Sequence, residues 1–343
     1  MLKSAAGDAS GAVSIGLIED AAERLNGLAV RTPLLGSSQL NEILGMRLFF
    51  KPECLQRTGS FKFRGAYTKL SRIPSEERKR GVVAYSSGNH AQGVASAAQL
   101  LGMHATIVMP SDAPRIKIEN TRGYGAQIVL YERHVEDRRA IAEEIAEKSG
   151  SLVVPPFNDR DIISGQGTVG LEIAQQAGDL DISFDEVLCP VGGGGLLSGL
   201  ATALAARFPM ARMWCAEPVG YDDVIRSLEA GTPVTAEVGA ASICDAIVTP
   251  RPGNITFEIM QRLVSGGFAV SDDEVVRAIA VLFDRLKLVV EPGGAAAFAA
   301  LLQQRERFAG KTVVIVLSGG NVDRDDYAGF LERAKSMDSS LPA

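Results

Sequence analysis

Short apolar runs alternate with segments of helical periodicity along most of the chain. Residues 15–28 carry apolar side chains at helical spacing, and the run at 47–51 predicts a strand. Further strands are predicted at 82–85, 106–109, 127–131 and 152–154, with helices between them at 91–101, 114–124 and 136–148. This rhythm is typical of βα units on a parallel sheet.

A second series of the same kind follows. Its predicted strands lie at 186–189, 212–216 and 312–317, and its predicted helices at 167–177, 196–207, 273–286 and 294–304. Because no repeat or low-complexity segment separates the series, two α/β lobes sharing one cleft are the economical interpretation. Ligands of open parallel sheets bind beyond the carboxyl ends of the strands. Three polar or glycine-rich stretches stand at such ends, at 86–90, 192–195 and 318–321.

Composition limits the class of protein. The chain has 343 residues, 46% apolar and 22% charged, with a net charge of −6, which argues against a nucleic-acid partner. No apolar run approaches the length of a membrane span, and the first residues lack the apolar core of a signal peptide. The four cysteines are widely scattered, as in a reduced cytoplasmic protein, and three histidines are too few for a histidine-built metal site.

Lys62 stands between Phe61 and Phe63, just after a turn and at the start of a predicted helix that Ser60 is expected to cap. Most lysines on such a helix are solvated surface charges. An ammonium in apolar surroundings loses proton affinity, however, and a partly neutral lysine forms Schiff bases and moves protons. Taken alone, Lys62 would be interpreted as a solvated surface lysine. The three stretches at strand ends favour the reactive lysine instead.

Four adjacent glycines, Gly192, Gly193, Gly194 and Gly195, join a predicted strand to a predicted helix that begins at Leu196. Consecutive glycines let backbone N–H groups converge on an anion, and the helix N-terminus adds positive partial charge. A flexible turn is the alternative, but four glycines there would be a needless entropic penalty. The pattern favours a phosphate and matches neither a dinucleotide nor a nucleoside triphosphate motif.

A phosphate cradle together with a desolvated lysine indicates pyridoxal phosphate. Asn89 is then expected to donate to the phenolate oxygen of the ring, and Ser318 to face the pyridine nitrogen. A hydroxyl there leaves the nitrogen unprotonated, which favours expulsion of a β-substituent over transamination. An ordinary turn is an equal alternative for the stretch that begins at Ser318.

Taken together and in this order, the stretches around Lys62, Asn89, Gly192 and Ser318 resemble the threonine dehydratase and serine racemase family. These are pyridoxal phosphate enzymes with the fold of the tryptophan synthase β-subunit, and the resemblance runs from about residue 15 to residue 330. It implies a two-lobed α/β fold with parallel-type sheets and helices on both faces. The large cofactor-binding domain would comprise 1–55 and 159–343, and the small substrate-loop domain 56–158.

The resemblance also implies roles for single residues. Lys62 would carry the cofactor with Phe61 beside the ring, and Glu291 would line its back edge, where a buried carboxylate needs a partner. The substrate would be held by Ser86, Ser87, Asn89 and His90. The cysteine synthase branch usually has threonine where His90 stands, so β-replacement is less expected.

Ser87 bears on the choice between two activities. Simple threonine dehydratases often carry alanine at this position, whereas serine racemases carry a serine that acts as a second acid/base opposite the lysine. The resemblance therefore implies that Ser87 allows racemisation or action on D-amino acids. A merely local hydrogen bond is an equal alternative.

The acidic stretch 216–223 resembles the family's divalent-cation site, with Glu217, the Tyr221 carbonyl and Asp223 as ligands of Mg²⁺, Mn²⁺ or Ca²⁺. A solvated acidic loop is the alternative. Gln92, Tyr131, Lys287 and Asn321 match positions that contact a nucleotide effector in mammalian-type serine racemases. Such residues also serve ordinary interface packing.

The expected activity is a pyridoxal phosphate-dependent dehydratase that converts a small β-hydroxy amino acid to a keto acid and ammonia. Serine, threonine and 3-hydroxyaspartate all fit, and the protein is expected to be a cytoplasmic homodimer or homotetramer. The nearest alternative is a serine or aspartate racemase using the same site. A remote alternative is a non-catalytic regulatory protein that binds a nucleotide at its glycine loop.

Overall fold

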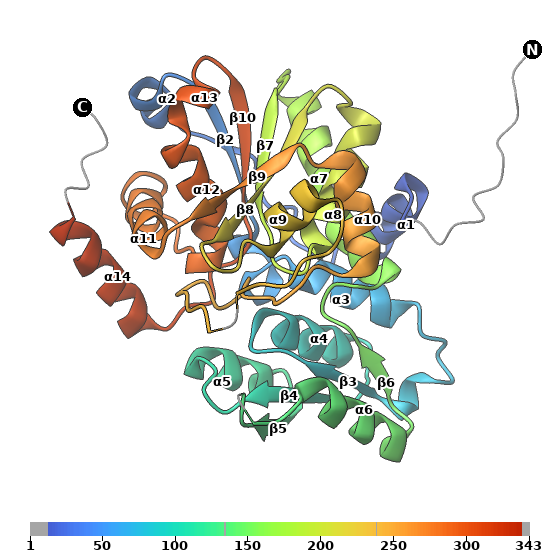
Figure 1. The fold of residues 1–343 in the computed structure, drawn as a ribbon. Coiled ribbons are helices and arrows are strands. Elements are labelled where there is room, and N and C mark those ends of the chain that lie inside the picture. The colour runs from blue at the N-terminus through green and yellow to red at the C-terminus, as the bar shows by residue number, and fades with distance from the viewer. Residues whose placement is uncertain (1–12, 134, 238, 338–343) are drawn as a thin grey trace, which may run out of the picture.

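The strands in the described part of the chain form two sheets, one above the other in Figure 1. The structure is a computed structural model, and it describes residues 13–133, 135–237 and 239–337. The larger sheet has the strand order β1-β2-β10-β7-β8-β9, in which every neighbouring pair is parallel except β1 and β2. Its strands are β1 (Leu35–Gly36), β2 (Arg47–Pro52), β7 (Glu186–Pro190), β8 (Arg212–Pro218), β9 (Gly266–Val270) and β10 (Thr312–Leu317).

Helices cover both faces of the larger sheet, because alternate residues of its central strands point to opposite sides. Val313 and Ile315 of β10 pack into one hydrophobic core, and Val314 and Val316 into the other. The first core takes its helices from α2 (Ser38–Leu44), α11 (Asp272–Val281), α12 (Pro292–Gln303), α13 (Arg305–Phe308) and α14 (Arg324–Ser336). The second takes them from α7 (Arg160–Asp179), α8 (Gly195–Arg207), α9 (Asp223–Ala230) and α10 (Asn254–Leu263), and α1 (Ile15–Leu25) packs on α7.

The smaller sheet has the order β5-β4-β3-β6 and is parallel throughout. Val82 and Ile107 point toward α3 and α4, whereas Val83 and Val108 point toward α6. Its elements are β3 (Val82–Tyr85), β4 (Ala105–Pro110), β5 (Gln127–Tyr131), β6 (Leu152–Val154), α3 (Lys62–Ser71), α4 (Asn89–Leu100), α5 (Arg115–Gly123) and α6 (Arg138–Ser149).

The predicted α/β architecture with two parallel-type sheets is confirmed, and the largest errors in the predicted helix boundaries are at α7 and α11. The helix predicted at 167–177 begins at Arg160, because the Asp159 side chain accepts the N–H groups of Asp161 and Ile162. The helix predicted at 273–286 keeps α-helical geometry only to Val281 and continues as one π-helical turn, η4 (Leu282–Leu286). The domain limits stay a prediction, although all four strands of the smaller sheet lie within 82–154.

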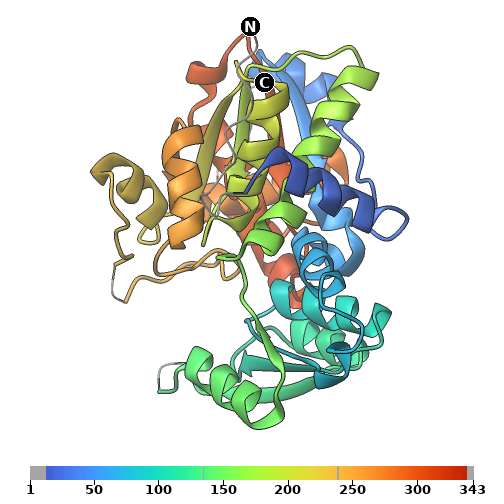
Figure 2. The same ribbon diagram turned by 90° about the vertical axis from the view of Figure 1, so that its right-hand side faces the viewer.

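The chain crosses between the sheets twice, after β2 and after β6 (Figure 2). The first crossing contains two short 3-10 turns, η1 (Glu53–Leu55) and η2 (Arg57–Gly59), and a third such turn, η3 (Arg78–Arg80), precedes β3. Both crossings contain residues of the functional site described below. Among the helices in the described part of the chain, none is long and apolar enough to cross a membrane.

Candidate active site

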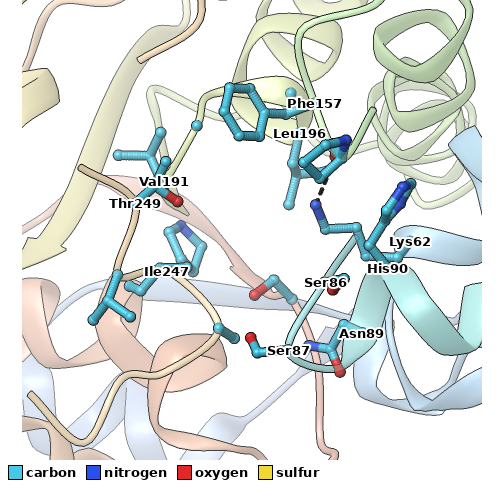
Figure 3. Close-up of a pocket in the computed structure, with 18 of the residues that line it drawn as sticks. Lys62, Ser86, Ser87, Asn89, His90, Phe157, Val191, Leu196, Ile247 and Thr249 are labelled. Carbon is cyan, nitrogen blue, oxygen red and sulfur yellow. Dashed lines mark hydrogen bonds between the residues drawn. The ribbon is translucent and has the colours of Figure 1, made fainter. Parts of the chain in front are cut away.

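A cavity lies between the two sheets, at the carboxyl ends of β3, β7 and β10 (Figure 3). All three stretches that follow these strands contribute to its lining, and so do both crossing segments. The lining residues from these segments include Phe61, Lys62, Ser86, Ser87, Asn89, His90, Pro156, Phe157, Gly192, Gly193, Gly194, Gly195, Leu196 and Ser318. The structure therefore brings the separate sequence stretches to one place.

Lys62 begins α3 and directs its amine into the cavity (Figure 3). Its Nζ donates to the Pro156 carbonyl oxygen at 2.9 Å and lies 5.2 Å from the centre of the Phe61 ring. Burial lowers the pKa of the Lys62 amine to about 8. Near that pH a large share of the amine is neutral, so it can attack a carbonyl or accept a proton. Phe63, by contrast, packs into the core beside α4.

Ser60 does not cap α3, contrary to the sequence prediction. The N-cap position is Phe61, and Ser60 Oγ has no hydrogen-bond partner among the described residues. The backbone of Ser60 instead pairs with Gly319, and the Phe61 N–H donates to the Ser318 carbonyl oxygen at 3.2 Å. The turn before Lys62 is thus bound to the loop after β10, and the helix begins at Lys62, as predicted.

Close approach of neighbouring atoms explains the glycine loop. A Cβ on Gly193 would lie 2.3 Å from the Phe157 ring, and Gly194 has a φ of +92°, in the left-handed region. Helix α8 begins at Gly195, and its first residues line the cavity. The first turn of a helix has N–H groups without helical acceptors and carries positive partial charge, so this side of the cavity suits an anion.

Asn89 is held in one orientation by two neighbours. Its Oδ1 accepts a hydrogen bond from Asn321 Nδ2 at 2.9 Å, and its Nδ2 donates to Glu291 Oε1 at 2.5 Å. Glu291 is buried, and the partner that its carboxylate requires is Lys117, whose Nζ donates to Oε2 at 3.1 Å. Burial raises the pKa of Glu291, and the charge of Lys117 opposes that rise.

Ser86, Ser87 and His90 surround the start of α4. Ser86 Oγ accepts the Gly88 N–H at 3.1 Å, and the Ser87 hydroxyl reaches toward the cavity (Figure 3). His90 Nε2 donates to the Val154 carbonyl oxygen at 3.1 Å. Burial and the nearby Lys62 lower the pKa of His90 to about 3, so its ring is neutral. The other ring nitrogen, Nδ1, can therefore only accept a hydrogen bond. A carboxylate also only accepts, so the His90 side chain does not suit a substrate carboxylate.

Two buried carboxylates lie close together in the acidic loop. Glu217 accepts the N–H groups of Val224 at 3.0 Å and Ile225 at 2.8 Å. Asp223 is also buried, and its Oδ2 has no partner among the described residues. Burial raises the pKa of Asp223 to about 7, and burial together with the Asp223 charge raises the pKa of Glu217 well above its usual range. The Tyr221 side chain is used elsewhere, since its hydroxyl donates to the Ala240 carbonyl oxygen at 3.0 Å.

Sequence reasoning missed several residues of the site. Lys117 and Asp245 form an ion pair at 2.9 Å and both line the cavity, as do Phe157 and Arg138. Lys117 and Arg138 look like ordinary solvated charges of a surface helix, and no local signal separates them from such charges. Of the positions compared with a nucleotide contact, Asn321 holds Asn89, whereas Lys287 Nζ donates to the Asp284 carbonyl oxygen. A nucleotide effector stays a prediction.

Comparisons with known proteins agree on one family. The family model described as "Pyridoxal-phosphate dependent enzyme" matches residues 25–319. An L-threo-3-hydroxyaspartate ammonia-lyase from Pseudomonas sp is 46% identical over 91% of this chain and 96% of its own length. A serine racemase from Schizosaccharomyces pombe is 40% identical over 92% of this chain and 96% of its own length.

A solved structure gives the same result for the fold. The crystal structure of a threonine deaminase from T.th. superposes with a TM-score of 0.85 at 43% identity. The match covers 90% of this chain and 99% of that one. The fold of this chain is therefore shared with an enzyme of similar sequence.

Proposed function

Because the chain belongs to the family of pyridoxal-phosphate dependent enzymes, we propose that it is an ammonia-lyase acting on a β-hydroxy amino acid. The observation that carries the proposal is the position of Lys62, whose amine faces the cavity that the glycine loop and the start of α8 line. The reaction would yield one keto acid and one ammonia. The family match also favours an enzyme over the non-catalytic nucleotide-binding alternative.

The residues of the cavity fit pyridoxal phosphate. The backbone N–H groups of the four glycines and of the first turn of α8 can surround its phosphate, and the glycine at position 193 lets Phe157 pack against this loop. Lys62 would be the covalent attachment point, beside the Phe61 ring, and the second hydrogen on Asn89 Nδ2 would serve the phenolic oxygen. Ser318, only 6% exposed and lining the same cavity, would serve the ring nitrogen. When bound, the cofactor supplies an electron sink for charge that develops at the substrate Cα.

The protein would then supply proton transfer and substrate orientation. Lys62 Nζ would take the proton from Cα, and the hydroxyl on Cβ would take up a proton and leave as water as its bond to Cβ breaks. A water molecule would then hydrolyse the released imine to the keto acid and ammonia. Ser86 and the amides at the start of α4 would bind the α-carboxylate, because a helix N-terminus favours an anion. We propose that His90 contributes its backbone there, since its Nε2 hydrogen is used by Val154.

Arg138 favours a substrate with a second carboxylate. It lies at the start of α6 among the lining residues, 5.8 Å from the centre of the Tyr85 ring, and makes no ion pair within the described part of the chain. The other basic residues of the lining are Lys62 and Lys117, of which Lys117 is already paired. A free guanidinium in a cavity that binds amino acids can form two hydrogen bonds with a carboxylate on Cβ. We therefore place 3-hydroxyaspartate before serine and threonine.

Replacing Arg138 with alanine should separate these substrates. We expect kcat/KM for L-threo-3-hydroxyaspartate to fall by about 10- to 100-fold, because a hydrogen bond to a charged group contributes about 1.5–3 kcal/mol. The values for serine and threonine should stay within a few-fold, since they lack the second carboxylate. Arg139→Ala is the matched control, because Arg139 is exposed and pairs with Glu143 on the surface. Equal loss for all three substrates would refute the assignment.

We also propose a divalent cation between Glu217 and Asp223. Two buried carboxylates with raised pKa values, one of them with an unpartnered oxygen, are an unfavourable arrangement unless a cation lies between them. No group of three or more histidine, cysteine or acidic side chains with metal-binding geometry occurs in the described part of the chain. Backbone carbonyls such as that of Tyr221 and water would therefore complete the ligand set of Mg²⁺, Mn²⁺ or Ca²⁺.

A thermal melt with and without chelator tests the cation. We expect Mg²⁺ or Ca²⁺ to raise the melting temperature of chelated protein, because a ligand bound only by the folded state stabilises it by about 2.7 kcal/mol at one hundred times its Kd. Asp223 takes up a proton below about pH 7, so the effect should weaken as the pH falls through 7. The double variant Glu217→Gln with Asp223→Asn should melt at a higher temperature than chelated wild type. Its melting temperature should not change when metal is added. Wild-type melting that does not respond to metal at pH 8 would disprove the site.

Racemisation is the second candidate activity, and Ser87 favours it. Its hydroxyl and the amine of Lys62 reach into the cavity from different sides (Figure 3). Two groups on opposite sides of a substrate Cα can each exchange a proton with it.

The assembly stays a prediction of a homodimer or homotetramer. Cytoplasmic localisation also stays a prediction.

A further inference from the structure

Lys117 is a buried lysine that the proposed reaction does not use. Its side chain is 1% exposed, and its ammonium lies between two carboxylates, Glu291 at 3.1 Å and Asp245 at 2.9 Å. Lys117 belongs to α5, beside the smaller sheet, whereas Glu291 is the N-cap residue of α12 on the larger sheet. Burial alone would lower the pKa of Lys117, but the two carboxylates outweigh it and raise that pKa, so Lys117 is charged in the folded protein. The ion pairs therefore join the two halves of the molecule at the cavity.

The surrounding backbone is shaped around these side chains. A Cβ on Gly88 would lie 2.2 Å from Lys117 Cδ, and a Cβ on Gly319 would lie 2.2 Å from Glu291 Oε1. Besides the ion pairs of Lys117, helix α5 makes a second contact with the larger half of the molecule. Asp323 accepts the N–H groups of Arg115 at 3.2 Å and Ile116 at 3.0 Å. The Lys117 side chain thus packs directly against Gly88, which lies between Ser87 and Asn89 in the sequence.

From Lys117 a continuous set of hydrogen bonds leads to Asn89. Glu291 receives the ammonium on Oε2 and the Asn89 Nδ2 on Oε1, and Asn321 Nδ2 donates to Asn89 Oδ1. The charged form of Glu291 can only accept, which requires Asn89 to present its nitrogen to it. One Nδ2 hydrogen is used by Glu291, and the second remains for a ligand in the cavity.

We propose that Lys117 is a positioning residue, which keeps Glu291 charged and so holds Asn89 with its amide donor toward the cofactor. This inference rests on the proposed function only for the identity of the group that Asn89 meets. Without the ammonium, the buried Glu291 carboxylate would take up a proton, because burial already raises its pKa. A protonated Glu291 donates as well as accepts, so only the hydrogen bond from Asn321 Nδ2 would then favour the present orientation of Asn89. Lys117 would act on the site through two intermediaries and touch no reacting atom.

Three variants test the proposal. Lys117→Met removes the ammonium and keeps the length of the side chain, and the double variant Lys117→Met with Glu291→Gln also removes the stranded carboxylate. Arg122→Met is the matched control, an exposed cation on the same helix. The measurements are the Kd of pyridoxal phosphate, the absorption spectrum of the bound cofactor, and the melting temperature of the cofactor-free protein.

We expect Lys117→Met to weaken cofactor binding by about 10- to 100-fold and to shift the absorption band, with a lower melting temperature of the cofactor-free protein. The double variant should regain most of the melting temperature and part of the affinity, because the introduced glutamine amide carries no charge and its oxygen still accepts from Asn89. If Lys117→Met fails to fold, the double variant must fold and bind, or the proposal is wrong. Arg122→Met should match wild type throughout.

Other results would overturn the inference. A lower melting temperature with unchanged affinity and spectrum would show that Lys117 only holds the two halves together. A double variant no better than Lys117→Met would show that Glu291 is not the residue through which Lys117 acts. Wild-type protein that binds no pyridoxal phosphate would instead refute the proposed function, so the two failures are distinguishable.

Discussion

Lys62→Ala is expected to abolish keto-acid release from every β-hydroxy amino acid, with a loss on the order of 10⁴-fold or more. The variant loses the covalent attachment point of the cofactor and the base that takes the Cα proton, so both steps fail together. The visible absorption band of the lysine-bound cofactor should disappear as well. The fold should survive, because Lys62 Nζ makes a hydrogen bond only to the Pro156 carbonyl oxygen and carries no ion pair in the described part of the chain.

The matched control for this prediction is Lys69→Ala on the same helix. Lys69 pairs with Asp159 and Asp161 at a partly exposed site, so its loss should cost at most about 1 kcal/mol of stability and leave turnover intact. Cofactor-free Lys62→Ala should melt at or above the wild-type temperature, since burial of the Lys62 charge is unfavourable below its lowered pKa of about 8. Turnover near the wild-type rate in Lys62→Ala would mean that another residue is the base.

Ser87→Ala is expected to separate elimination from racemisation. If Lys62 serves one side of the substrate Cα and Ser87 the other, the variant should retain elimination from the L-amino acid within a few-fold. It should lose reaction of the D-amino acid and exchange of chirality by about 10²-fold or more, because no acid or base remains on that side. Incubation of L-serine in D₂O, followed by analysis of chirality and Cα deuteration, measures both outcomes.

The conservative control is Ser87→Thr, which keeps a hydroxyl at the same position. It should retain part of the activity toward the D-amino acid if the hydroxyl transfers a proton. An equal loss on both enantiomers in Ser87→Ala would mean that Ser87 only positions the substrate or cofactor. Racemisation would then have no second acid or base, and the ammonia-lyase reaction would be the one remaining proposed activity.

Local patterns predicted most of the described strands, because buried parallel strands are short β-branched runs, but they missed β9, whose sequence begins with two glycines. The run 312–317 coincides with β10, and 82–85 with β3. The start of α7 was missed because Gly165 and Gly167, at and just before the predicted start, disfavour a helix in isolation. In the fold these glycines allow neighbouring helices to approach closely, since a Cβ on Gly167 would lie 2.9 Å from the Gly199 carbonyl oxygen. Tertiary packing outweighs propensity there.

The residues of the site also fall into those that local sequence predicts and those that depend on the fold. Residues in contiguous motifs, such as those around Lys62 and Asn89, were predicted because their neighbours in sequence are also their neighbours in space. Lys117 was missed because its burial depends on Asp245 and Glu291, which lie 128 and 174 residues away along the chain. The need of Glu291 for a partner could be inferred from sequence, whereas the identity of that partner required the fold.

The most direct test of the proposed activity is the balance of products from the purified protein with pyridoxal phosphate. Incubation with L-threo-3-hydroxyaspartate, threonine or serine, with keto acid and free ammonia measured together, gives the stoichiometry. We predict equal amounts of keto acid and ammonia, with 3-hydroxyaspartate as the best substrate. Keto acid without free ammonia would indicate transamination, and no keto acid from any of the three would contradict the assignment as a β-hydroxy amino acid ammonia-lyase.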